Sequence, residues 1–171
     1  MVATAPTRES TVWAALAEIA DPEIPAISLV DLGVIRGIAF APLPGRGERL
    51  TVELMPTFVG CPAIEVMQQL IGERLSGMAD EVSVELTFAE PWTSDRITPQ
   101  GREALRASGF APPVHIGSTF TGDSLTVLPI ATCPYCGSRN TTLENPFGPT
   151  LCRAIYHCAD CRQPFEAFKP V

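Results

Sequence analysis

Hydrophobic positions in the first part of the chain follow helical and strand spacing in turn. In residues 10–20 apolar side chains recur at the period of a helix behind a Ser or Thr that can cap, and Asp21-Pro22 ends this predicted helix. Residues 34–40 are apolar and β-branched, and residues 50–54 alternate apolar with polar side chains. A turn rich in Pro and Gly separates these two runs, so they are predicted to form a hairpin.

A second helix and a third strand follow the hairpin. Pro62 suits the first turn of a helix, and apolar side chains then recur at helical spacing up to the stop at Gly77. In the strand that follows, one face is predicted to carry Val82, Val84, Leu86 and Phe88. The resulting α-β-β-α-β order predicts an α+β fold over residues 1–90, with a mixed sheet and helices on one side.

The sequence pattern of the remaining residues is different. Residues 91–124 are interpreted as a connector that contains a short helix over residues 98–108, ended by Gly109 and by the breaker Pro112-Pro113. From residue 125 onward, short β-prone pieces surround two Cys-x-x-Cys turns. Residues 125–171 are therefore predicted to form a zinc-ribbon-like β domain.

Four cysteines have the spacing of a metal site. Two turns, each with two residues between its cysteines, are separated by a spacer of 21 residues, and they hold Cys133, Cys136, Cys158 and Cys161. Two such turns can close a tetrahedron of thiolates around one ion. Zinc is the predicted ion, and iron is the rival because it accepts the same donors. With all four positions filled by sulfur, the site predicts a folding staple and not a catalytic centre.

Composition and charge narrow the function classes. A content of 46% hydrophobic and 18% charged residues is that of a globular protein, and no apolar run approaches the roughly 20 residues that span a bilayer. The net charge of −7 argues against binding of nucleic-acid phosphates. Paired Cys-x-x-Cys turns are typical of metal ligands in a reducing compartment, so a cytoplasmic protein without a membrane span is expected.

Cys61 is a second candidate for chemistry. It lies at the predicted entry of a helix, where backbone amides can stabilise a thiolate, while Thr57 offers a hydroxyl and Gly60 lets a ligand approach. An inert, packed cysteine is the alternative that the residues leave open. Asp21 and Glu23 would share a pocket with Cys61 if the sheet brought the two loops together, and otherwise they only end a helix. The sixth cysteine, at position 152, is expected to pack as a small hydrophobe.

Several motifs in the first part resemble a known domain. Residues 21–25 (Asp-Pro-Glu-Ile-Pro), residues 31–34 (Asp-Leu-Gly-Val) and the placement of Thr57 four residues before Cys61 resemble the signature of the iron–sulfur cluster assembly domain related to SufT. The resemblance implies that Cys61 contacts a transient cluster, with Thr57, Asp21 and Glu23 beside it.

The chain as a whole resembles the PaaD family. The similarity rests on residues 91–95 (Pro-Trp-Thr-Ser-Asp), residues 111–113 (Ala-Pro-Pro), and the ribbon segments 133–138 and 164–169. The resemblance implies an accessory role in the ring-1,2-phenylacetyl-CoA epoxidase system of aerobic phenylacetate breakdown. Assembly or insertion of an iron–sulfur cluster in the reductase partner is the implied task, and the other epoxidase subunits are further expected partners.

Alternative functions make different predictions. The chain has no Glu-x-x-His helices for a di-iron site and no dinucleotide-binding glycine motif, so neither the oxygenase nor the reductase activity is expected and no catalytic residue is assigned. A non-catalytic scaffold of the epoxidase complex remains an alternative in which every cysteine is structural. A homodimer through an exposed sheet edge is also open.

Overall fold

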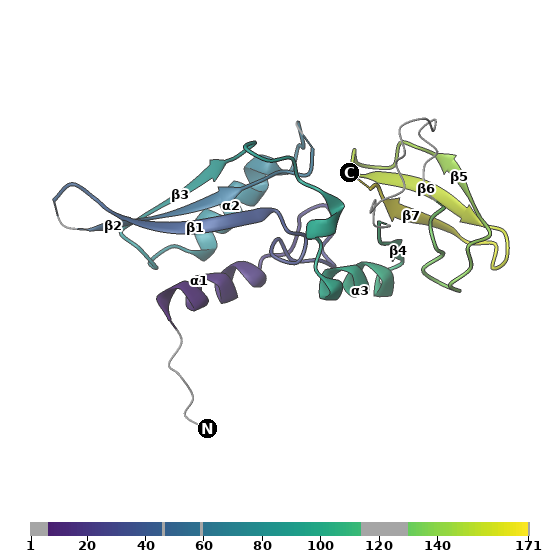
Figure 1. The fold of residues 1–171 in the computed structure, drawn as a ribbon, viewed down its shortest axis with the longest axis horizontal. Helices are drawn as coiled ribbons and strands as arrows, with labels where there is room; N and C mark the ends of the chain where they lie inside the picture. The colour runs from purple at the N-terminus through teal and green to yellow at the C-terminus, as the bar shows by residue number, and fades with distance from the viewer. Residues whose placement is uncertain (1–6, 46, 59, 114–129, 171) are drawn as a thin grey trace, which may run out of the picture. The chain divides into compact units, whose positions relative to one another are not determined.

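The structure is a computed structural model that describes residues 7–45, 47–58, 60–113 and 130–170 (Figure 1). The chain divides into two compact units, Met1–Pro91 and Trp92–Val171, called here unit 1 and unit 2. Each has its own sheet. None of the described helices is long and apolar enough to cross a membrane.

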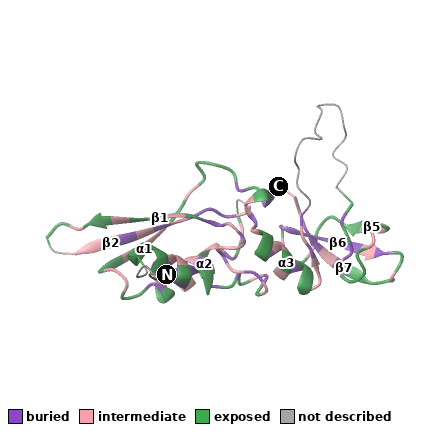
Figure 2. Ribbon diagram, turned by 60° about the horizontal axis from the view of Figure 1, so that its bottom comes forward, coloured by how far each residue is buried: buried purple, intermediate pink, exposed green. Residues whose placement is uncertain are grey.

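Unit 1 has the predicted α-β-β-α-β order. Its elements are α1 (Arg8–Ala17), β1 (Ile35–Pro42), β2 (Glu48–Leu54), α2 (Ile64–Arg74) and β3 (Glu81–Leu86). The sheet order is β1-β2-β3, with β1 antiparallel and β3 parallel to the central β2. Both helices lie on one side of this sheet (Figure 2). The mixed sheet and the α+β class are thus confirmed.

Alternation along β2 explains the core of unit 1. Leu50, Val52 and Leu54 are fully buried, and the residues between them are half-buried. The buried face of β2 meets α1 and α2, since an amphipathic strand must bury its apolar side. The element ends differ slightly from the prediction: α1 begins earlier because the Thr7 hydroxyl accepts a hydrogen bond from the Ser10 amide, and β3 ends at Leu86.

Unit 2 is built on a four-stranded sheet. Its elements are the 3₁₀ helix η1 (Ser94–Arg96), α3 (Pro99–Ala107), β4 (Phe110–Ala111), β5 (Thr141–Asn145), β6 (Arg153–Cys158) and β7 (Pro164–Phe168). The strand order is β4-β7-β6-β5. The short helix lies where the sequence predicts it, because Thr98 caps it and Pro99 takes its first position.

The segment interpreted as a connector belongs to unit 2. Its strand β4 adds to the ribbon sheet by parallel pairing with β7, and Trp92 packs on Phe168 with ring centroids 5.7 Å apart. The Arg102 guanidinium donates to the carbonyls of Ser94 and Pro113, which ties the segment together. The ribbon unit therefore begins at Trp92, and the expected start near residue 125 lies outside the described residues.

Candidate metal centre

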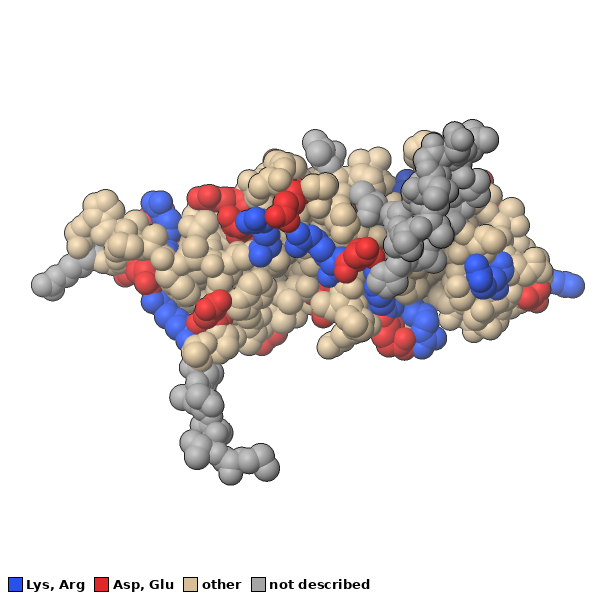
Figure 3. All heavy atoms as spheres, in the orientation of Figure 1, with Lys and Arg blue, Asp and Glu red and all other residues tan. Residues whose placement is uncertain are grey.

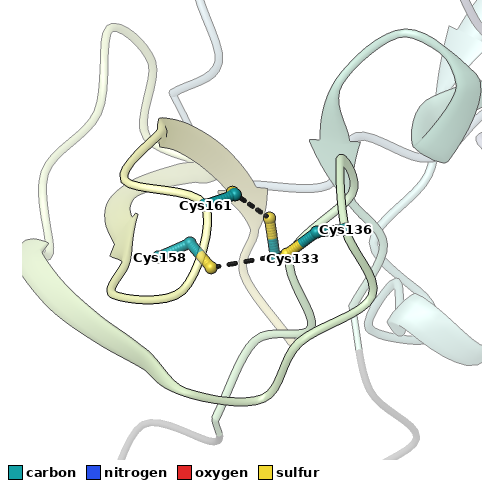
Figure 4. Close-up of side chains that lie close together, drawn as sticks. All are labelled: Cys133, Cys136, Cys158 and Cys161. Atoms are coloured by element: carbon teal, nitrogen blue, oxygen red, sulfur yellow. Dashed lines mark hydrogen bonds between the residues drawn. The ribbon is translucent and has the colours of Figure 1, made fainter.

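The four ribbon cysteines converge in unit 2 (Figure 4). Their Sγ atoms all lie within 4.8 Å of one another, and the Cys133–Cys161 and Cys136–Cys158 sulfur pairs are each 3.6 Å apart. A tetrahedron of metal–sulfur bonds of about 2.3 Å has edges of about 3.8 Å. None of these cysteines is in a disulfide. The donor set and its spacing fit one tetrahedral ion.

The two Cys-x-x-Cys turns share one backbone geometry. In the first turn the Gly137 amide donates to the Cys133 carbonyl at 2.9 Å, and in the second the Arg162 amide donates to the Cys158 carbonyl at 2.9 Å. In both turns the residue after the second cysteine has a left-handed backbone conformation, with φ of 75° at Gly137 and 59° at Arg162. Among the residues that the structure describes, Arg162 is the only non-glycine residue with positive φ. The turn geometry therefore imposes strain at Arg162 that glycine avoids in the first turn.

Asp160 links the two turns. Its carboxylate accepts hydrogen bonds from the Ser138 hydroxyl and, at 2.8 Å, from the Asn140 side-chain amide. These bonds lower the pKa of Asp160. The Ala159 amide also donates to the Asn140 carbonyl at 2.9 Å. Contacts outside the ligand set thus hold the two halves of the site in register.

Thiol ionisation is uneven within the cluster. Backbone amides of Cys161 and Asp160 point at the Cys158 sulfur and lower the pKa of that thiol to about 7. Desolvation raises the pKa of Cys161 to about 12, against a stabilising amide from Gln163. Four thiolates this close repel one another, so a cation is the natural partner that lets all of them deprotonate.

One buried cluster of unit 2 includes two of the ligands. It consists of Ala111, Ala131, Cys133, Ala154, Tyr156, Cys158, Phe165 and Ala167. Alanines make up half of this set, and aromatic packing comes from the stacked rings of Tyr156 and Phe165. Burial of apolar area scales with side-chain size, so this cluster depends on the metal site more than a cluster of large aliphatic residues does.

Cys61 lies in the loop between β2 and α2 and is half-buried. Burial raises the pKa of its thiol, and the charges of Glu23 and Asp21 raise it further. Amides of Ala63 and Ile64 point at the sulfur and oppose this rise. The sequence predicts that the helix entry favours a thiolate; the amides are present, but desolvation and the two carboxylates outweigh them.

The acidic loop is held in place by Asp21. This residue is only 7% exposed, and its Oδ1 accepts the amides of Glu23 at 2.9 Å and Ile24 at 2.7 Å. The loop lies close enough for both carboxylates to act on Cys61, and Thr57 is half-buried four residues earlier in the Cys61 loop. Within the described part of the chain, only the ribbon cysteines form a group of three or more ligands compact enough to share an ion.

Comparisons with known proteins cover nearly the whole chain. Residues 9–86 match the family described as iron–sulfur cluster assembly protein, and residues 121–169 match the PaaD zinc beta ribbon domain. An Escherichia coli (strain K12) protein that is named as a subunit of the "Putative 1,2-phenylacetyl-CoA epoxidase" is 38% identical over 166 residues, which cover 96% of this chain and 94% of that protein. The chain belongs to the PaaD family.

Solved structures were found that are similar to part of this PaaD-family chain. A domain of unknown function, DUF59, from Bacillus anthracis has a TM-score of 0.50 at 22% identity, over 57% of this chain and 91% of that chain. A conserved hypothetical protein from Thermotoga maritima has a TM-score of 0.47 at 26% identity, over 60% of this chain and 98% of that chain. The first similarity supports the fold alone.

Some residues that shape the PaaD metal centre are not identified by the sequence reasoning. A glycine directly after Cys136 is a visible sign of a left-handed turn, but Arg162 gives no such sign at the equivalent place. Asp160 lies inside the second Cys-x-x-Cys turn and reads as an exposed acidic residue. Cys152 is buried, as expected for a packed cysteine, and its sulfur lies 3.1 Å from the Thr150 hydroxyl.

Proposed function

We propose that this chain is a non-catalytic, cytoplasmic accessory protein of the phenylacetyl-CoA epoxidase system that assists iron–sulfur cluster assembly or insertion in the reductase partner. The match of residues 9–86 to an iron–sulfur cluster assembly protein supports the task, and the Escherichia coli relative supports the system. The observation that carries the proposal is the half-buried Cys61 thiol beside the acidic loop of Glu23 and Asp21.

Cys61 suits brief contact with a cluster that is cargo and not a resident cofactor. Its raised pKa keeps the thiol protonated at neutral pH until iron binds; the sulfur–iron bond then forms as the proton leaves to solvent. The charges of Glu23 and Asp21 disfavour a thiolate but favour a nearby cation. Asp21 holds the loop, and Thr57 joins the proposed site by its position in the assembly-domain signature. One chain offers one cysteine here, so the remaining ligands would come from the recipient.

We further propose that the ribbon binds zinc as a folding staple. Four thiolates would fill the tetrahedron and leave no position for an activated water, which is the arrangement of a structural zinc site. Metal analysis of the purified chain tests the identity of the ion. About one zinc per chain and a colourless protein are expected, whereas a red protein with about one iron would assign iron instead.

Cluster content of the reductase tests the main proposal. The chain is co-produced with the reductase, and iron and sulfide per reductase are measured after purification without air. Cys61→Ser is expected to lower cluster content severalfold, while the matched variant Cys152→Ala, at a cysteine buried in the other unit, leaves it unchanged. An equal zinc content in the unchanged chain and in both variants verifies that the ribbon is intact in each of them. Full cluster content with Cys61→Ser contradicts the proposal.

A scaffold is the second candidate function. It is favoured by one observation: Cys61, Glu23 and Asp21 are not among the compact ligand groups found in the described residues. A scaffold predicts that Cys61→Ser leaves the reductase filled with cluster. It also predicts that disruption of the ribbon by Cys133→Ser prevents the chain from joining the epoxidase complex, which co-purification measures.

A further inference from the structure

The inward face of the unit 1 sheet continues beyond its helical cover. Along β3, Val82 and Val84 are half-buried, but Leu86 is 40% exposed and Phe88, just after the strand, is 58% exposed. Leu86 pairs with the fully buried Leu54 of β2, so the two side chains lie on the same face of the sheet. The exposure of Leu86 therefore marks the place where the helices stop covering this face.

Cys61 belongs to the same edge of the sheet. Strands β2 and β3 are parallel, so their carboxyl ends meet at one edge, and the Thr87 amide still donates to the Leu54 carbonyl there at 2.9 Å. The loop that carries Cys61 leaves β2 at this edge, and α2 begins there with Val66 in its first turn, 45% exposed. We call this surface the Cys61 edge; its members are Cys61, Val66, Leu86 and Phe88.

Charge is distributed unequally between the two units. Residues 1–91 hold 13 acidic and 5 basic residues, a formal net charge of −8, whereas residues 92–171 have a net charge of +1. Each described arginine of unit 1 has an acidic partner. On the face that Figure 3 draws, basic and acidic side chains are interspersed. All of the excess negative charge of the protein therefore belongs to the unit that holds Cys61.

The Cys61 edge itself has acidic neighbours. Glu65 lies in the first turn of α2, is exposed, and forms no ion pair with an arginine that the structure describes. The carboxylates of Glu23 and Asp21 lie close enough for their charges to act on Cys61. The edge thus combines exposed apolar side chains with carboxylates beside them. An apolar centre with a polar rim is the usual anatomy of a protein–protein interface.

We propose that the Cys61 edge is the docking surface for the cluster-receiving protein, which presents an apolar patch rimmed by Lys and Arg. Such a partner covers Leu86 and Phe88 and brings its own cysteines against Cys61. The −8 charge of unit 1 attracts a basic surface and repels both a nucleic acid and a second copy of the same unit. This inference rests on the proposed function, because the receiver is the reductase partner named there.

Binding of the full-length chain to the purified reductase tests the docking surface. The double variant Leu86→Ser/Phe88→Ser is expected to raise the Kd at least about tenfold, since a few residues at the centre of an interface carry most of its binding energy. The matched control is Phe147→Ser, which removes a side chain that is 70% exposed in unit 2 and leaves the Kd unchanged. Thermal unfolding verifies that all variants are folded.

The acidic rim has its own test. Glu65→Gln is expected to slow association severalfold at low salt, an effect that shrinks as ionic strength rises. Glu144→Gln, an exposed carboxylate of unit 2, is the matched control with an unchanged association rate.

Several outcomes separate this inference from the proposed function. If the Leu86/Phe88 double variant binds the reductase as tightly as the unchanged chain, the docking surface is overturned. If that variant instead dissociates a homodimer in sedimentation, a second copy occupies the edge and the inference is also overturned. If Cys61→Ser leaves the reductase filled while the double variant loses binding, the cluster-transfer function fails and the docking surface stands.

Discussion

Gly137 is predicted to set the metal affinity of the ribbon through its backbone conformation alone. Its φ is 75°, and a Cβ built at this position meets no atom within 4 Å, so Gly137→Ala adds no clash. A left-handed conformation costs a non-glycine residue roughly 1–2 kcal/mol, and alanine regains about 0.4–1 kcal/mol through the less flexible unfolded chain. The net loss is about 1 kcal/mol, which is about fivefold in a binding constant when folding and metal binding are coupled.

Competition with a chromophoric chelator measures this effect. Gly137→Ala is expected to bind zinc about fivefold more weakly, and Arg162→Gly about fivefold more tightly, because it relieves the same conformation at φ 59°. Gly72→Ala is the matched control: its Cβ also meets nothing within 4 Å, but it lies inside α2, so it should stabilise unit 1 by about 0.5–1 kcal/mol and leave zinc affinity unchanged. Unchanged affinity in Gly137→Ala, or weaker binding by Arg162→Gly, would refute the reasoning.

Three further predictions concern metal removal and pH. Chelation under reducing conditions should abolish the amide protection of β5 to β7 while unit 1 stays protected in hydrogen exchange; simultaneous loss from both units would contradict this. Because Glu23 raises the pKa of Cys61, Glu23→Gln should speed alkylation of Cys61 by iodoacetamide at pH 8 roughly two- to fivefold in the zinc-loaded chain, and an unchanged rate would count against the carboxylate. Burial raises the pKa of Tyr156 above that of the unfolded chain, so the stability that this side chain contributes is complete below pH about 10 and is lost as the pH rises through the folded pKa. Denaturant unfolding should therefore show that Tyr156→Phe loses less stability at alkaline pH than the unchanged chain, and equal losses would exclude Tyr156 as the cause.

Periodicity in the sequence was sufficient to predict unit 1. Its strands and helices are amphipathic, and a β2-α2-β3 crossover leaves few alternatives to a mixed sheet with helices on one side. The residues that were interpreted as a connector were harder to assign. Strand β4 has only two residues, and it exists because β7 offers an edge to pair with. Such a strand has no local pattern of its own.

The ribbon site and the Cys61 site also differ in how far the sequence alone predicts them. The ribbon cysteines are separated by fixed short turns, so their spacing alone predicts convergence on one point. The ionisation of Cys61 depends on how deeply the loop is buried and on carboxylates about 40 residues away in sequence. Desolvation is a property of the folded surroundings, and for that reason the helix-entry argument gave the wrong direction for this pKa.

The pairing of β4 with β7 has a consequence for anyone who wishes to transplant the ribbon into another protein. The family match to the ribbon spans residues 121–169, but the sheet is completed by a strand at Phe110–Ala111 and by Trp92 against Phe168. A graft that begins at residue 121 leaves one edge of β7 unpaired, and an unpaired strand edge promotes aggregation between copies. The transferable module therefore begins at Trp92, almost thirty residues before the family match to the ribbon begins.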